Sequence, residues 1–261
     1  MWARADIWTV YASARRHGSK IAAGCILWRT IMMFCRRVFL SLILGFCLMS
    51  FCFSQEIFSQ ISKVSVYVEQ SRNILFFGDS LTAGFGLTPS QAFPAYIQNK
   101  IQGMEWNFSV FNAGLSGETS SAGLRRVDWL LRNKVDVLVL ALGANDGLRG
   151  ISPELTEKNL QGIIDKVRRK NSRVEIVIAG MRMPPSLGLD YNRQFEAVFS
   201  NLARRNDGRL IPFLLEGVAG MVNLNLDDGI HPTAEGHKII AKNVWLVLKP
   251  VLEKMICRQR R

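Results

Sequence analysis

From residue 73 onward, the chain alternates short apolar runs with longer stretches in which apolar residues recur at helical spacing. The most apolar run, at residues 135–142, is typical of a strand that is buried on both faces of a parallel sheet. Strands are predicted at residues 73–77, 107–112, 135–142, 174–179 and 210–213. Helices are predicted at residues 92–101, 121–131, 153–167 and 191–205, and from a cap at Thr233 towards Leu252, with Pro250 bending or ending the last one. This alternation predicts one α/β domain, a three-layer α/β/α sandwich around a central, mostly parallel five-stranded sheet.

The N-terminal part of the chain carries a pattern of another kind. Arg36 and Arg37 precede sixteen uncharged residues at positions 38–53. Basic residues before an apolar run that ends in small residues are typical of a secretory signal. Because the run is slightly short for a membrane span, cleavage on export is favoured over anchoring to the inner membrane by residues 38–53. We therefore expect an exported protein, periplasmic or secreted.

These patterns divide the chain into four parts. Met32 and Met33 would each start a signal peptide of ordinary length, so residues 1–31 are interpreted as an overlong start. The parts are a leader at 1–54, with the signal peptide or anchor at 32–54, a linker at 55–72, the α/β domain at 73–254, and a basic tail at 255–261.

The formal net charge of +12 raises the question of an anionic partner. Residues 1–54 contain seven basic residues and one acid, so half of the excess lies in the leader. Elsewhere the basic residues form short pairs within helical patterns, such as Arg125-Arg126, which is typical of a solvated helix face. We expect no nucleic-acid partner, and any association with a membrane should come through the leader.

Cysteine usage narrows the chemistry further. Four of the five cysteines lie in the leader, which leaves Cys257 alone near the C-terminus. This pattern excludes a disulfide framework and a cysteine-rich zinc site for the exported chain. No His/Cys cluster in the sequence offers a metal or cofactor site, so we expect no metal and no organic cofactor. Independently of the cysteines, we expect a monomer.

Four segments collect polar residues and glycine where strands end or just before the last helix. They are residues 78–84, 112–119, 143–146 and 228–233. Ligand sites of open α/β sheets lie beyond the carboxyl ends of the strands, where such segments meet. Each segment taken alone could also be an ordinary turn, because Gly, Asp, Asn and Ser are frequent turn residues.

Two of these segments carry the parts of a nucleophilic hydrolase. Ser80 follows the first strand in the sequence Gly-Asp-Ser-Leu, and Asp228 stands three residues before His231. In such enzymes a histidine activates a serine hydroxyl and an acid orients the histidine. The chain has only two other histidines, His17 in the leader and His237 inside the last predicted helix, where a structural or exposed role is expected. His231 is therefore the candidate base.

The other two segments offer hydrogen-bond donors. A glycine of residues 112–119 can present its backbone N–H to a developing oxyanion without a side chain in the way, and Asn145 can present its side-chain amide. The first of these segments could equally be a connector in which Ser116 or Thr119 caps the next helix.

Together and in this order, the four segments resemble the SGNH (GDSL) hydrolase family. The resemblance covers nearly all of residues 73–252. Within the family, residues 145–150 and 227–232 look similar to the arylesterase, acyl-CoA thioesterase I and lysophospholipase L1 group. The resemblance implies the flavodoxin-like α/β/α fold and a site made by Ser80, Gly117, Asn145, Asp228 and His231.

The resemblance also implies a role for each residue. Ser80 would attack an acyl carbonyl, His231 would carry the proton, and Asp228 would hold the imidazole. The backbone N–H groups of Ser80 and Gly117 and the amide of Asn145 would meet the oxyanion. Two other acids, Asp79 and Asp146, are expected to organise their loops, and the alternative is that one of them orients His231 in place of Asp228.

The implied activity is a serine esterase or thioesterase that forms an acyl-enzyme. Its substrates would be small acyl or aryl esters, thioesters or lysophospholipids. Two alternatives are a carbohydrate O-acetylesterase acting on cell-wall sugars and an inactive lipid-binding envelope protein.

Overall fold

The computed structural model describes residue 55 and residues 71–259. The predicted leader and residues 56–70 of the predicted linker lie outside this part of the chain. Among the described residues, no helix is both long enough and apolar enough to cross a membrane.

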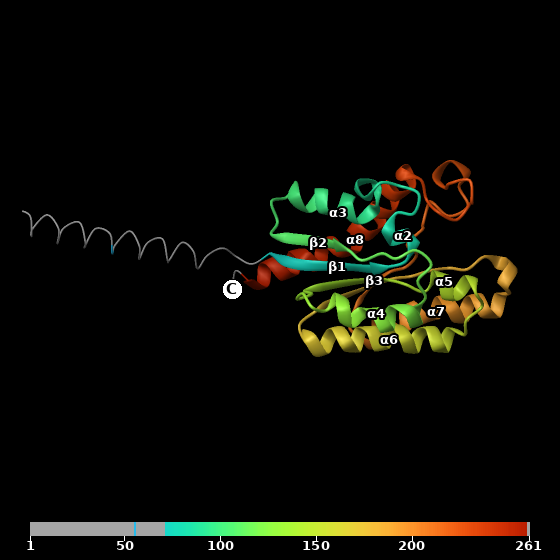
Figure 1. Ribbon diagram of the computed structural model, residues 1–261, viewed down its shortest axis with the longest axis horizontal. Coiled ribbons are helices and arrows are strands. Elements are labelled where there is room, and N and C mark those ends of the chain that lie inside the picture. The colour runs from blue at the N-terminus through green and yellow to red at the C-terminus, as the bar shows by residue number, and fades with distance from the viewer. Residues whose placement is uncertain (1–54, 56–70, 260–261) are drawn as a thin grey trace, which may run out of the picture. The chain divides into compact units, whose positions relative to one another are not determined.

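Five parallel strands form one sheet in the order β2-β1-β3-β4-β5 (Figure 1). The central strand β3 is buried along its whole length because helices cover both faces of the sheet. The predicted sandwich with a five-stranded parallel sheet is confirmed. The strands are β1 (Arg72–Gly78), β2 (Phe108–Asn112), β3 (Val137–Ala141), β4 (Glu175–Ala179) and β5 (Arg209–Ile211).

Two layers of helices enclose the sheet. Helices α3 and α8 lie on one face, and α4, α6 and α7 lie on the other (Figure 1). The five longer helices confirm those predicted from the sequence. The helices are α2 (Ser80–Ala83), α3 (Phe93–Gln102), α4 (Ser120–Leu130), α5 (Ala144–Leu148), α6 (Pro153–Lys170), α7 (Leu189–Arg205) and α8 (Ala234–Gln259), with short 3₁₀ turns at Pro89–Gln91, Pro185–Leu187 and Val222–Leu224.

The last helix is longer than the sequence predicted. α8 continues through Pro250 to Gln259, so the alternative that Pro250 ends the helix is wrong, whereas a bend at Pro250 stays a prediction. Proline cannot donate to the carbonyl four residues earlier, at Leu246, but that residue is highly exposed and water can serve the carbonyl. On the other side of the helix, Leu248 and Leu252 are fully buried and hold it to the sheet.

The predicted tail is also part of this helix. The boundary placed at residue 254 falls inside α8, and residues 255–259 continue it. Arg258 forms an ion pair with Glu175 at the start of β4, with 2.8 Å between Nη1 and Oε1. The last described residues therefore pack with the domain instead of forming a separate segment.

The last strand is shorter than predicted. Residues 210–213 were expected, and β5 ends at Ile211. Pro212 has no N–H to donate to the neighbouring strand, so the ladder stops before it.

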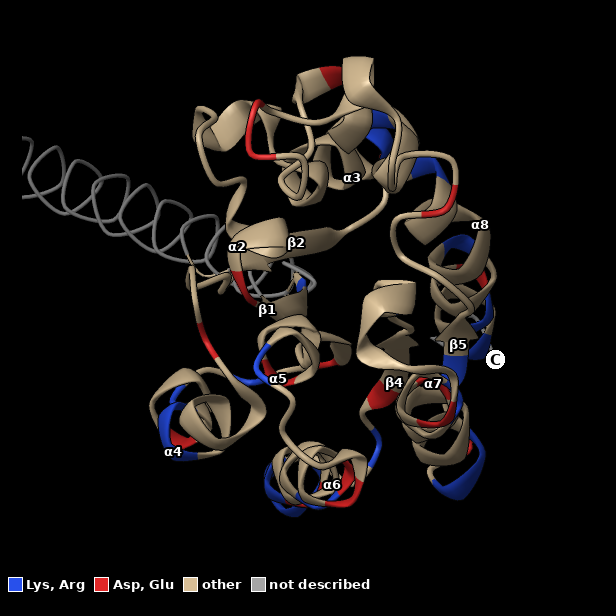
Figure 2. Ribbon diagram, turned by 90° about the vertical axis from the view of Figure 1, so that its right-hand side faces the viewer, with Lys and Arg blue, Asp and Glu red and all other residues tan. Residues whose placement is uncertain are grey.

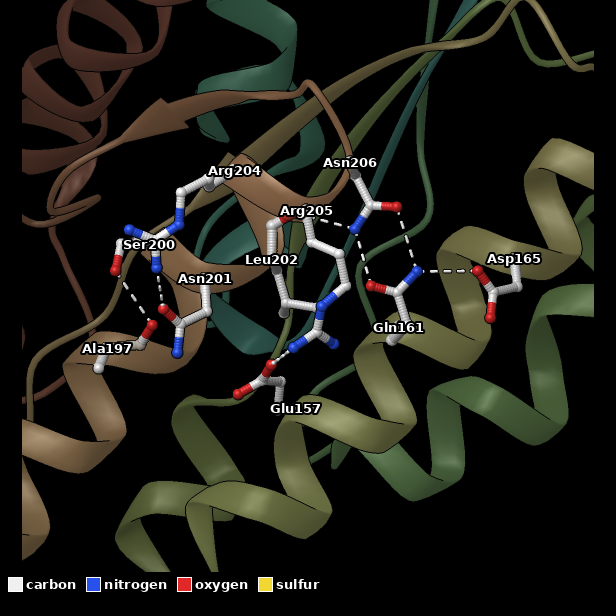
Figure 3. A network of polar contacts seen from close by, with 10 residues as sticks. All are labelled: Glu157, Gln161, Asp165, Ala197, Ser200, Asn201, Leu202, Arg204, Arg205 and Asn206. Atoms are coloured by element: carbon white, nitrogen blue, oxygen red, sulfur yellow. Dashed lines mark hydrogen bonds and ion pairs between the residues drawn. The ribbon is translucent and has the colours of Figure 1, made fainter.

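Polar side chains join α6 to α7 on the outer layer (Figure 3). Gln161 and Asn206 exchange two amide hydrogen bonds of 3.1 and 2.7 Å, and Asn206 also caps the carbonyl of Leu202. Arg205 pairs with Glu157 at 2.6 Å. These contacts fix the two helices that cover β3 and β4 on this face.

Most charged side chains lie on the outer helices. Figure 2 shows blue and red segments on α4, α6, α7 and α8. The prediction of solvated helix faces fits Arg125, which is exposed, but it is wrong for Arg126. The guanidinium of Arg126 turns inward and binds the buried carboxylate of Glu118.

Candidate active site

The Gly-Asp-Ser-Leu segment forms a sharp turn from β1 into the short helix α2. A Cβ added to Gly78 would lie 2.0 Å from Oγ1 of Thr82 and 2.8 Å from the carbonyl oxygen of Ala141, so only glycine fits there. Asp79 caps the helix, because its Oδ1 accepts the N–H of Leu81 at 3.0 Å. Ser80 is thereby placed as the first residue of α2, at the carboxyl end of the sheet.

The segment that precedes α8 brings His231 to this serine across 151 positions of sequence. Nε2 of His231 lies 3.0 Å from Oγ of Ser80. Nδ1 of His231 lies 2.7 Å from Oδ2 of Asp228. The three side chains therefore form one continuous chain of hydrogen bonds.

Local backbone contacts hold this segment in shape. Oδ1 of Asp228 accepts the N–H groups of Ile230 and His231 at 3.0 and 2.9 Å, around Gly229 with a φ of 74°. The N–H of Leu226 donates to the carbonyl of His231 at 2.7 Å. The carboxylate and the imidazole are thus fixed relative to each other by the main chain as well as by their own bond.

The electrostatics of Asp228 suit an ionised partner of a histidine. Its hydrogen bond to the ring of His231, followed by the backbone N–H groups of His231 and Ile230, lowers the pKa of this carboxyl to about 2. The ring of Phe85 lies against the imidazole, with 4.3 Å between ring centroids. Phe85 was not singled out from the sequence, and its position in a connecting loop gave no signal for it.

The two predicted oxyanion donors lie in neighbouring loops at the same edge. Gly117 has a φ of 77° in a turn that is closed by the N–H of Glu118 donating to the carbonyl of Leu115. A positive φ at the third position of a turn favours glycine. Asn145 is the second residue of α5, and its Nδ2 donates to the carbonyl of Glu118 at 3.2 Å.

A cavity of about 610 Å³ opens at this edge. Ser80, Gly117, Asn145 and His231 all line it, while Asp228 is bound to His231 and is not among the lining residues. Most of the remaining wall is apolar and comes from segments that are far apart in the sequence: Leu81, Phe85, Leu148, Met181, Met183, Pro184, Pro185, Phe213, Leu215 and Ile230. The structure therefore brings all five predicted site residues to one place.

The two other acids near the site have partners of their own. Asp146 is fully buried and accepts the backbone N–H of Ser120 at 2.7 Å together with its hydroxyl, to which Asn159 also donates. Asp79 caps α2, and burial raises the pKa of its carboxyl to about 7. Both acids organise their loops, and Asp228 is the acid bonded to His231.

Of the two roles expected for His237, structural or exposed, the structure shows the structural one. It is buried, its Nδ1 accepts the N–H of Phe93 at 3.1 Å, and its ring stacks on Phe93. Burial, with repulsion from His231, lowers the pKa of His237 to about 4. Across the described part of the chain, no three His, Cys, Asp or Glu side chains cluster as a metal site would require.

Known proteins resemble the chain over this same region. A model of the GDSL-like lipase/acylhydrolase family matches residues 76–239, which include all four segments described above. The chain is 37% identical over 183 residues to a Pseudomonas aeruginosa protein named esterase TesA, a match that covers 70% of this chain and 90% of that protein.

A second relative and a solved structure match a similar share of the chain. The chain is 38% identical over 180 residues to thioesterase 1/protease 1/lysophospholipase L1 of Escherichia coli K12, covering 69% of this chain and 84% of that protein. The crystal structure of AlinE4, described as an SGNH-hydrolase family esterase, matches with a TM-score of 0.58 at 38% identity, covering 71% of this chain and 98% of that one.

Proposed function

Because the chain belongs to the GDSL-like lipase/acylhydrolase family and is a serine hydrolase of esters and thioesters, we propose that Ser80 is its nucleophile, His231 its base and Asp228 the acid that orients His231. The resemblance drawn from the sequence is thereby confirmed at the level of the family. The observation that carries the assignment is the unbroken chain of contacts from Asp228 through His231 to Ser80, at 2.7 and 3.0 Å.

Acylation begins at the hydroxyl of Ser80. Its Oγ attacks the acyl carbonyl carbon while its proton passes to Nε2 of His231. The resulting imidazolium is stabilised by the ionised carboxylate of Asp228. When the tetrahedral intermediate collapses, His231 gives the proton to the departing alcohol or thiol, and the acyl group stays on Ser80.

Deacylation repeats the sequence with water. His231 takes a proton from a water molecule, whose oxygen attacks the acyl-enzyme carbonyl, and then returns the proton to Oγ of Ser80. The products are a carboxylic acid and the free enzyme. No electron transfer and no cofactor enters either half of the reaction.

Three donors would stabilise the negative oxygen in both halves. They are the backbone N–H of Ser80, the backbone N–H of Gly117 and the side-chain amide of Asn145. The N–H of Ser80 is the first of α2 and has no acceptor within that helix. Removing one such donor typically lowers kcat by about 10²–10³-fold.

The cavity favours an acyl chain over a sugar. Its wall combines Phe85, Leu148, Met183 and Phe213, and apolar walls bind hydrocarbon by excluding water. A carbohydrate O-acetylesterase would instead need hydrogen-bonding groups for hydroxyls. The names of the relatives do not favour that alternative, and the contact between Ser80 and His231 argues against an inactive lipid-binding protein.

The test is a panel of p-nitrophenyl esters and acyl thioesters, run with Ser80→Ala and with Ser116→Ala as a matched control. Ser116 is exposed in the same cavity, with no hydrogen bond to His231 among the described contacts. We expect Ser80→Ala to lose hydrolysis and fluorophosphonate labelling while Ser116→Ala keeps both. Undiminished hydrolysis by Ser80→Ala would contradict the assignment of Ser80 as the nucleophile.

We also propose that the protein is exported by its leader, which rests on the basic and apolar pattern of residues 36–53. N-terminal sequencing of the protein recovered outside the cytoplasm should find a start near residue 55. Recovery with residues 38–53 intact in the membrane fraction would instead support the anchor.

A further inference from the structure

A buried ion pair lies directly beside the proposed oxyanion donors. The side chain of Glu118 is 1% exposed, and both of its oxygens are bound by Arg126. Nε of Arg126 donates to Oε1 at 2.6 Å, and Nη2 donates to Oε2. Two parallel bonds fix the plane of a carboxylate as well as its position.

Stability alone is a weak reason for such a pair. Removing two charges from water costs several kcal/mol, and apolar residues of similar volume often serve the fold as well or better. The contacts that surround the pair point to another purpose.

The guanidinium of Arg126 connects the oxyanion loop, residues 113–119, to β1, the strand that precedes the nucleophile. Its Nη2 also donates to the carbonyl of Ala113 at 2.8 Å, so one side chain holds the loop near both ends. The same group lies over the ring of Phe77, 4.8 Å from its centroid. Phe77 belongs to β1, which leads directly to Ser80.

Glu118 in turn touches both donor residues through its backbone. Its carbonyl accepts Nδ2 of Asn145 at 3.2 Å, which orients that amide and leaves the second amide hydrogen for an oxyanion. Its N–H closes the turn onto Leu115 and so holds Gly117 at its positive φ. A shift of Glu118 would therefore move both donors relative to Ser80.

We propose that Glu118 and Arg126 are positioning residues that hold the N–H of Gly117 and the amide of Asn145 in place to receive the oxyanion formed at Ser80. The proposal rests on the function proposed above. Neither side chain touches the substrate, and the ion pair acts only through the loop and through Asn145. Arg149 adds a single exposed bond from its Nη2 to the carbonyl of Gly117, at 3.2 Å, and is the weaker support of the two arginines.

Two conservative variants test this. Glu118→Gln keeps the size of the side chain but removes its charge. Arg126→Lys keeps the charge but loses the two parallel hydrogen bonds to Glu118. We expect kcat per active site to fall about 10–100-fold in each, less than for outright loss of a donor. KM should stay within about threefold, because the donors act on the transition state more than on bound substrate. Active sites are counted by fluorophosphonate labelling carried to completion, so a partly unfolded sample does not lower the value.

Arg125→Lys is the matched control, since Arg125 is the adjacent exposed arginine of α4 and its side chain donates to Ser121. It should keep the wild-type kcat. A merely structural role of the ion pair would lower the melting temperature and the number of active sites but leave kcat per active site unchanged. If Glu118→Gln does not fold, the kcat per active site of Arg126→Lys and of Glu118→Asp tests the proposal instead.

A second arm measures coupling to Asn145. In an Asn145→Ala background, Glu118→Gln should lower kcat by a smaller factor than it does in the wild-type background, because one of the donors that Glu118 orients is already absent. Equal costs in the two backgrounds, or wild-type kcat per active site in both Glu118→Gln and Arg126→Lys, would overturn the proposal. Those outcomes leave the assigned nucleophile intact, whereas a wild-type protein that no fluorophosphonate labels would contradict the proposed function itself.

Discussion

Asp228 is exposed, and yet the pKa of its carboxyl is lowered to about 2. The ring of His231 is the main cause, and the backbone N–H groups of His231 and Ile230 add to it. Since the folded pKa lies below the ordinary value of 3.8, the interactions of this carboxylate are fully present above that value. They are lost only as the pH falls through about 2. Asp228 is therefore ionised at every pH at which ester hydrolysis is ordinarily measured.

This makes Asp228→Asn informative. The amide keeps the shape of the side chain but cannot stabilise an imidazolium, and it favours the wrong tautomer of His231, so kcat should fall by about 10³–10⁴-fold. The acid limb of the wild-type pH–rate profile should not come from Asp228, because the pKa of its carboxyl lies at about 2, below the assayed range. Profiles from pH 4 to 9 for wild type, Asp228→Asn and the neighbouring exposed Asp227→Asn check this. Wild-type activity in Asp228→Asn would show that another group orients the base.

At the scale of the elements, α2 and α8 are each held in place by a buried titratable group, and the two groups make the stability change with pH in opposite directions. Asp79 caps α2 with its pKa raised to about 7, mainly by burial. His237 binds α8 to the first turn of α3 with its pKa lowered to about 4, also mainly by burial. Between pH 4 and 6.5 the unfolded chain binds more protons at His237, so this group makes stability rise with pH. Between pH 3.8 and 7 the folded chain binds more protons at Asp79, so that group makes stability fall as pH rises.

The two contributions should partly cancel in the wild-type protein and separate in variants. His237→Gln retains an acceptor for Phe93 and should leave a free energy of unfolding that decreases more steeply from pH 4.5 to 7 than in wild type. Asp79→Asn retains a cap for α2 and should shift the slope towards an increase. Urea unfolding at several pH values measures both slopes. Identical slopes in all three proteins would mean that neither group titrates as its burial indicates.

Apolar periodicity predicted the longer elements of the fold but not its shortest helices. The strands and the five longer helices follow from apolar periodicity, which needs several turns or residues to be visible. The helices α2 and α5 have only four and five residues, too few to show a period, and the sequence suggested loops there. The inward turn of Arg126 was invisible for a related reason. In the sequence it is one of two adjacent arginines, and only the approach of Glu118 from a separate loop distinguishes them.

At the scale of the whole molecule, parallel topology explains why the site could be anticipated at all. All strands point the same way, so the segments that follow β1, β2 and β3 must meet at one edge, together with the segment before α8. The motifs Gly-Asp-Ser-Leu and Asp-Gly-Ile-His then identified the residues by family resemblance. The cavity wall was beyond prediction, because Phe85, Met183 and Phe213 come from connections whose conformation no local pattern fixes.

The extent of this site leads to a prediction about the whole chain. The sheet, both helix layers, the cavity and all five proposed site residues lie between residues 71 and 259, in the compact unit Gln70–Arg261. A protein that begins at Gln70 should therefore fold and cleave p-nitrophenyl esters with kcat and KM within about twofold of the full-length protein, because its transition-state contacts are unchanged. Ser80→Ala in the same shortened protein controls for contaminating esterases. If the shortened protein folds cooperatively but its kcat falls tenfold or more, residues 1–69 contribute to the site, and the proposed division between leader, linker and hydrolase domain is wrong.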